Sequence, residues 1–201
     1  YNDESHNHND IGTFSLYVND EPVFIDAGVG TYSKKTFSNE RYTIWTMQSD
    51  YHSLPRINGY SQSYGREYRS KDVKADKGKN SFSLDISGAY PKEAGINKWV
   101  RSYQIKNNEL YIEDAFDIAD TKEKNQINFL TWGDVDISTL GVVTIKTPSG
   151  ESVKLIYDKN LFTPTVEIIA LDDARLSNVW GAEIKRLSLD AQKIEKQGKY
   201  T

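Results

Sequence analysis

Hydrophobic and polar residues alternate along most of the chain, and turn-forming residues interrupt the alternation roughly every 10–15 residues. Successive side chains of a β-strand point to opposite faces, so this alternation predicts strands with one buried face. The predicted strands are residues 13–18, 23–26, 54–57, 68–76, 81–86, 98–106, 109–116, 125–132, 142–146, 152–157, 165–171 and 182–189.

Short turn sequences separate neighbouring segments and predict β-hairpins. These turns are residues 19–22, 58–59 (Asn-Gly), 77–80, 107–108 (Asn-Asn) and 148–151. No stretch longer than about ten residues has a 3.6-residue apolar period, although residues 42–48 can form one helical turn. The pattern therefore predicts an all-β fold, an antiparallel two-sheet β-sandwich, with residues 1–201 forming a single domain.

The composition fits a well-solvated β-protein. Hydrophobic residues make up 37% of the 201 residues, and aromatic residues make up 12%, with 13 Tyr and 4 Trp. The apolar share is below the roughly 45–50% that is usual for globular domains. This profile favours a carbohydrate-facing β-protein over a tightly packed helical bundle.

Charge and cysteine content exclude several classes of function. The net charge of −4 repels a polyanion, so general nucleic-acid binding is not expected. The longest apolar run, Ile168 to Leu171, is far shorter than the ~20 residues of a membrane span. The chain has no cysteine, which excludes disulfides, thiolate metal sites and cysteine nucleophiles.

All three histidines lie in the first 52 residues, and two of them form His6-Asn7-His8. In an extended strand residues i and i+2 share a face, so this pair can present two imidazoles together. Such a pair suits one metal, or one metal ligand beside a free imidazole. The alternative is that both are solvent-facing residues near a frayed chain end.

Two further residues can complete a metal site. Asp26 ends a predicted strand before the sequence Ala-Gly-Val-Gly, where its carboxylate is open to a ligand or caps a turn. His52 precedes another predicted strand and is either a ligand or a structural histidine. With His8 they form a set of two imidazoles and one carboxylate, which favours Zn²⁺ over Ca²⁺ or Mg²⁺.

Five segments resemble, in the same order and with consistent gaps, blocks of the heparinase II/III-like C-terminal domain family. They are residues 5–17 (SHNHNDIGTFSLY), 22–32 (PVFIDAGVGTY), 51–62 (YHSLPRINGYSQ), 85–99 (DISGAYPKEAGINKW) and 101–116. In that family the β-sandwich follows an α/α toroid, and the whole protein acts as a polysaccharide lyase on uronic-acid polymers. The resemblance covers approximately residues 4–135.

The resemblance implies roles for individual residues. It makes His8, Asp26 and His52 ligands of a zinc ion, or of another divalent cation, and it turns His6 toward the substrate groove. Tyr42 falls within a few residues of an active-site tyrosine of some relatives, and the alternative for it is an aromatic ring packed in a short loop. The metal would have a structural role, because it fixes His8 and so aims His6.

The expected function is that of the C-terminal domain of a polysaccharide lyase that cleaves glycosaminoglycan or alginate-like polymers by β-elimination. Its partners would be an anionic polysaccharide and an N-terminal toroid of the same protein, in the periplasm or outside the cell. The chain would then be a fragment that is inactive alone. The alternatives are a non-catalytic carbohydrate-binding sandwich and a zinc hydrolase, which the lack of an accompanying general-base Glu disfavours.

Overall fold

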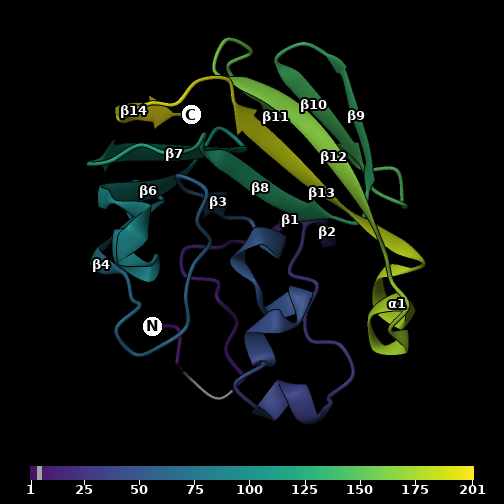
Figure 1. Ribbon diagram of the computed structural model, residues 1–201. Helices are drawn as coiled ribbons and strands as arrows, with labels where there is room; N and C mark the ends of the chain where they lie inside the picture. Colours follow the sequence, from purple (N-terminus) through teal and green to yellow (C-terminus); the bar gives the residue numbers. More distant parts are fainter. Residues whose placement is uncertain (4–5) are drawn as a thin grey trace.

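The computed structural model describes residues 1–3 and 6–201; residues 4 and 5, including the first residue of the segment 5–17, lie outside the described residues. Strands make up 45% of the chain and helices 13%. The sheets are antiparallel, and the prediction of an all-β sandwich is confirmed. Figure 1 shows the sheets at one end of the molecule, with the N-terminal segment and short helical turns at the other.

Two larger sheets form the sandwich. The five-stranded sheet has the order β14 (Gln197–Tyr200), β7 (Glu109–Ile118), β6 (Ile96–Lys106), β5 (Ser81–Asp85) and β4 (Lys71–Asp76). The four-stranded sheet has the order β12 (Phe162–Ala170), β13 (Glu183–Ala191), β8 (Gln126–Thr131) and β3 (Pro55–Arg56).

Two smaller sheets accompany them. Three strands follow the order β11 (Ser152–Ile156), β10 (Val142–Lys146) and β9 (Asp134–Thr139), and β1 (Leu16–Val18) pairs with β2 (Glu21–Phe24). The β1–β2 turn is shorter than predicted, since only Asn19 and Asp20 form it, both with positive φ. Asn107 and Asn108 also have positive φ and close the predicted β6–β7 hairpin, as Asn tolerates this region well.

A hydrophobic core joins the sheets. Trp99 and Phe116 of the five-stranded sheet, Phe129 and Leu187 of the four-stranded sheet, and Ile145 of β10 belong to one buried cluster. A second, smaller cluster includes buried residues Ile25, Ala27, Leu130, Leu171, Leu176 and Ile184. The alternation in the sequence therefore identifies the faces that meet in the sandwich.

The remaining elements are short helices. The 3-10 helices are η1 (Lys34–Phe37), η2 (Arg41–Thr43), η3 (Trp45–Met47), η4 (Ser49–Tyr51), η5 (Ser87–Ala89) and η6 (Lys92–Ala94), and the α-helix is α1 (Ala174–Trp180). The single helical turn predicted over residues 42–48 is therefore wrong in detail, because this segment contributes to two separate 3-10 helices. Among the described residues, no helix is long and apolar enough to cross a membrane.

Candidate metal centre

Four side chains converge beside the β1–β2 hairpin: His8, Asp10, Asp26 and His52. One ligand atom from each lies within 4.8 Å of the others. The Nδ1 atom of His8 is 3.1 Å from Nε2 of His52, and the same Nε2 is 3.4 Å from Oδ2 of Asp26. The structure thus brings together the three residues predicted as ligands and adds Asp10.

The loop that carries His8 and Asp10 is held by backbone and amide hydrogen bonds. The backbone N–H of Asn9 donates to the Met47 carbonyl at 2.9 Å, and the side-chain amide of Asn9 donates to the Gln62 backbone carbonyl at 3.2 Å. The Gln62 side chain accepts from the Ile11 N–H at 3.0 Å and donates to the Ile11 carbonyl at 2.7 Å. Residues on both sides of Asp10 are therefore anchored.

Arg41 holds the same loop from the side of His8. Its guanidinium is buried and donates to the Asn7 carbonyl through Nε at 3.1 Å and Nη2 at 2.8 Å. Its Nη1 donates to the Thr36 carbonyl at 3.1 Å, which ties the loop to η1. The buried Arg41 guanidinium therefore fixes the backbone immediately before His8.

Asp26 follows β2 and uses its two carboxylate oxygens differently. Oδ1 accepts the Gly28 N–H at 2.7 Å, while Oδ2 faces His52. Gly28 has φ of 75°, a conformation that favours glycine. The sequence left open whether Asp26 caps a turn or is available to a ligand. In the structure it does both, since one carboxylate oxygen caps the turn and the other faces the cluster.

His52 ends η4 and is only 1% exposed. Its Nδ1 lies 2.9 Å from the Gln48 carbonyl, so this nitrogen carries the proton and donates. Nε2 then points into the cluster with its lone pair available to a cation. A metal-bound histidine is usually oriented in this way by a second acceptor.

Burial and mutual charge shift the titration of the cluster. Burial lowers the pKa of His8 to about 4, and the neighbouring His52 acts in the same direction. Burial opposes ionisation of Asp26, but the hydrogen bond and charge of His52 outweigh it and lower its pKa to about 2. Burial alone would lower the pKa of His52, but the interaction with Asp26 outweighs burial and raises this pKa. Burial raises the pKa of Asp10.

The donor set fits a tetrahedral cation with nitrogen and oxygen ligands. Two ligands about 2.0–2.1 Å from zinc are separated by about 3.3 Å in a tetrahedral site. The separations of 3.1 Å and 3.4 Å around Nε2 of His52 are close to this value. His8, Asp26 and His52 can therefore hold a divalent cation, with Asp10 near enough to serve as a fourth ligand.

His6 lies outside this group of four and differs from the expected geometry. Its φ of 65° places it in a left-handed turn, so His6 and His8 do not share one face of an extended strand. The prediction of an extended His-x-His pair is wrong, because the loop follows the Arg41 hydrogen bonds at Asn7 instead. The exposed His6 ring contacts Tyr32 and Phe37, each with a centroid separation of 5.9 Å.

Tyr42 lies in η2 and stacks on Tyr64, with ring centroids 4.6 Å apart. Burial raises its pKa, so the phenol stays protonated over a wider range than usual. Tyr42 and His6 thus belong to different aromatic groups. A catalytic role for either residue stays a prediction.

The chain matches one family of known proteins. The model of the family described as heparinase II/III-like, C-terminal, matches residues 2–179. The chain belongs to this family. The heparinase II/III-like C-terminal domain is the C-terminal domain of polysaccharide lyases, and full-length members carry lyase activity. No curated protein matches the chain.

The predicted ligand set does not include Asp10, and the sequence gives no sign of Gln62 and Arg41 as supports of the cluster. Asp10 follows His8 by two residues, and this His-x-Asp spacing was the available signal. Gln62 ends the segment 51–62 that resembles the family, but nothing in its sequence context indicates bonds to a loop 51 residues away.

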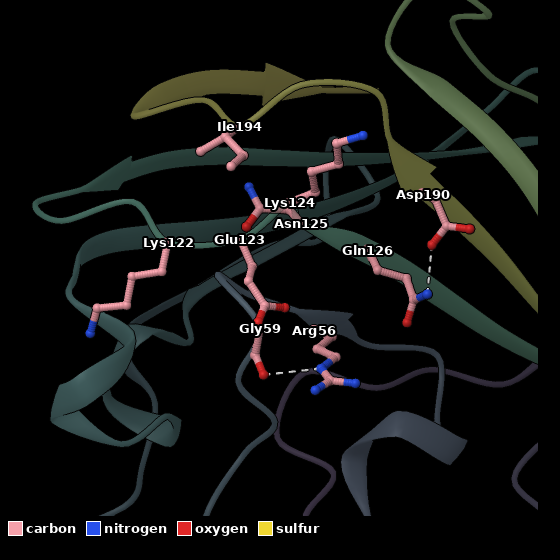
Figure 2. Close-up of a pocket in the computed structure, with 9 residues that line it drawn as sticks. All are labelled: Arg56, Gly59, Lys122, Glu123, Lys124, Asn125, Gln126, Asp190 and Ile194. Carbon is pink, nitrogen blue, oxygen red and sulfur yellow. Dashed lines mark hydrogen bonds between the residues drawn. The ribbon is translucent and has the colours of Figure 1, made fainter.

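A separate hollow of about 510 Å³ lies near β3 and β8 and is shown in Figure 2. Basic and acidic side chains line it, including Arg56, Lys122, Glu123 and Asp190. Gln126 donates to Asp190 at 2.6 Å at one side of it. None of the four cluster residues lines this hollow, so it is not part of the candidate metal centre.

Proposed function

We propose that this chain is the metal-containing C-terminal domain of a lyase that cleaves uronic-acid polysaccharides by β-elimination. The observation that carries the proposal is the convergence of His8, Asp26 and His52 from three separate segments. Membership of the heparinase II/III-like family supports the polysaccharide as substrate. Zinc is the cation we assign, because the donors are imidazole nitrogens and carboxylate oxygens.

The proposed role of the cation is structural. When bound, it would supply a fixed positive centre that joins the loop of His8 to η4 and to the end of β2. Asn7 and Arg41 then fix the backbone between His8 and His6. The imidazole of His6 is thereby presented at the surface, where a sugar chain can reach it.

β-Elimination requires two proton transfers on a uronate. A base removes the C5 proton, the electron pair of the C5–H bond forms the C4–C5 double bond, and the C4–O4 bond breaks. The departing O4 oxygen keeps the bonding electrons and takes a proton from an acid. Donors near the uronate carboxylate stabilise the negative charge that develops during proton removal.

This chain is proposed to supply part of that machinery. His6 is exposed and can reach the substrate, and the raised pKa of Tyr42 keeps its phenol protonated at neutral pH. The remaining groups would come from an N-terminal α/α toroid, so that the polymer lies between the two domains. Secretion to the periplasm or cell exterior would give such an enzyme access to its polymer.

The decisive experiment uses the full-length protein in which this chain is joined to the proposed toroid. It is incubated with heparan sulfate, chondroitin sulfate, hyaluronan and alginate, and the conjugated C4–C5 double bond is followed by ultraviolet absorbance. We expect an unsaturated product from at least one uronate polymer and none from His6→Ala. Polymer cleavage without an unsaturated product would indicate a hydrolase, and binding without cleavage would indicate a non-catalytic module.

A further inference from the structure

Four side chains from three segments form an exposed group that we name the Tyr32 platform: His6, Tyr32, Phe37 and Arg175. Tyr32 is 43% exposed and Phe37 is 67% exposed, although their rings contact each other with centroids 5.5 Å apart. His6 contacts both rings at 5.9 Å. The Arg175 guanidinium carbon lies 4.9 Å from the centre of the Tyr32 ring.

The platform is held in place by contacts beneath it. Asp173 caps α1 and accepts hydrogen bonds from the Thr31 amide at 2.6 Å and the Thr31 hydroxyl at 3.0 Å. A Cβ on Gly30 would lie 2.7 Å from the Asp173 carboxylate, so a larger residue there would push against the side chain that holds Thr31. The segment with Tyr32 is therefore locked to the helix that carries Arg175.

Three exposed basic side chains belong to the platform or lie beside it. The net charge is −4, yet Arg175 is exposed, and Lys34 and Lys35 in η1 are exposed beside Phe37. Within residues 1–3 and 6–201, no carboxylate lies within ion-pair distance of the Arg175 guanidinium. Its charge is consequently available to an anionic ligand.

We propose that the Tyr32 platform is a binding subsite for an anionic pyranose of the polysaccharide. The apolar face of the sugar would pack on Phe37 and Tyr32, because large exposed aromatic rings gain free energy when such a face covers them. The Arg175 guanidinium would donate paired hydrogen bonds to a carboxylate or sulfate of the same sugar. Contact of both rings with His6 places the subsite next to the proposed catalytic imidazole.

This inference rests on the proposed function for its substrate class, but its test does not need catalysis. Binding of three tetrasaccharides to the 201-residue chain is measured by calorimetry at two salt concentrations. Alginate tetrasaccharide carries carboxylates only, a heparin tetrasaccharide carries carboxylates and sulfates, and chitotetraose is neutral. We expect binding of at least one anionic probe and at least tenfold weaker binding of chitotetraose.

The variants Arg175→Ala and Phe37→Ala should each weaken binding of the anionic probe about 5- to 10-fold. Arg175→Ala should also reduce its dependence on salt, whereas Arg175→Lys should restore part of the affinity. Arg66→Ala is the matched control, since Arg66 is also exposed and lies 5.6 Å from the Tyr1 ring. It should bind like the unchanged chain, and equal melting temperatures confirm that the variants are folded.

The proposal is overturned if the unchanged chain binds no anionic probe, if chitotetraose binds equally well, or if Arg175→Ala and Phe37→Ala bind normally. A preference for the alginate or the heparin probe identifies the group that Arg175 recognises. If the variants lose binding but the full-length protein forms no unsaturated product, the lyase proposal fails and the subsite stands. If the variants bind normally but the full-length protein forms an unsaturated product, the subsite proposal fails and the lyase proposal stands.

Discussion

Arg101 and Asp114 form a fully buried ion pair across strands β6 and β7, with Nη2 and Oδ2 2.8 Å apart. Asp114 also accepts the indole N–H of Trp99 at 2.7 Å, and Arg101 donates through Nη1 to the Ser53 carbonyl at 2.7 Å. Ser53 directly follows His52. The pair therefore connects the five-stranded sheet to the segment that carries a proposed metal ligand.

Replacing Arg101 should strongly destabilise the fold. Arg101→Met leaves the Asp114 carboxylate buried without its partner, which typically lowers the free energy of unfolding by about 3–5 kcal/mol. Urea denaturation followed by tryptophan fluorescence measures this change. Adding Asp114→Asn to Arg101→Met should recover part of the loss, and a change below about 1 kcal/mol in the single variant would contradict the assigned role.

Removing the metal should lower the melting temperature. His8→Ala, Asp26→Ala and His52→Ala should each reduce zinc content and stability together, because a cation that binds only the folded state stabilises it. Metal content is measured by mass spectrometry, and unfolding is measured with and without a chelator. His6→Ala is the control and should keep its zinc; three ligand variants with full zinc content would rule out the site.

Asp10→Asn tests whether Asp10 takes part in the metal centre. If its carboxylate binds the cation or orients a ligand, the substitution should weaken zinc binding by about 10- to 100-fold, while a role outside the site leaves affinity unchanged. Competition with a chromophoric chelator gives the affinity. The raised pKa of Asp10 indicates that its charge is unfavourable in the metal-free chain, so the same substitution should not destabilise that form.

Gln62→Leu should weaken both the fold and the metal centre. The substitution removes the two bonds to Ile11 and leaves partly buried backbone groups without partners, a loss of about 1–3 kcal/mol. Because the loop of His8 and Asp10 loses an anchor, zinc affinity should fall as well. Gln126→Leu is the matched control: it loses the bond to Asp190, away from the cluster, and should keep its zinc affinity.

Alkaline pH should destabilise the chain through Tyr103. Burial raises the pKa of this phenol to about 12, and its hydroxyl donates to the Gly12 carbonyl. The folded state thus holds the proton more tightly than the unfolded state, whose pKa is about 10. The stabilisation is complete below pH ~10 and is lost as the pH rises toward 12.

Urea denaturation between pH 8 and 11.5 tests this dependence. Tyr103→Phe should lose some stability at pH 8, from the missing hydrogen bond, but should lose less than the unchanged chain above pH 10. Tyr17→Phe alters an exposed side chain and should follow the unchanged chain throughout. Identical pH profiles for all three proteins would argue against Tyr103 as a contributor.

The sequence predicts the sandwich well where alternation is strong, as in β6, β7, β8 and β13. It missed β9, whose residues are mostly exposed and lack a buried stripe, and β14, whose Gln-Gly-Lys-Tyr sequence has little β-forming character. The seven-residue α1 is too short for a helical period, and only Asp173 at its N-cap indicates a helix.

At the candidate metal centre, residue types and the family resemblance select His8, Asp26 and His52. Their meeting in space depends on hydrogen bonds between distant segments, such as Asn9 with Met47 and Gln62, which no local pattern encodes. The left-handed turn at His6 is equally hidden, since the Arg41 side chain that anchors Asn7 lies over 30 residues away.

The bond from Arg101 to Ser53 also bears on folding during protein synthesis. The three proposed ligands are translated before β6 and β7, which supply the support behind His52. A nascent chain that ends before Asp114 therefore lacks the support that holds this imidazole. Tight loading of the cation should consequently wait until β7 has been translated.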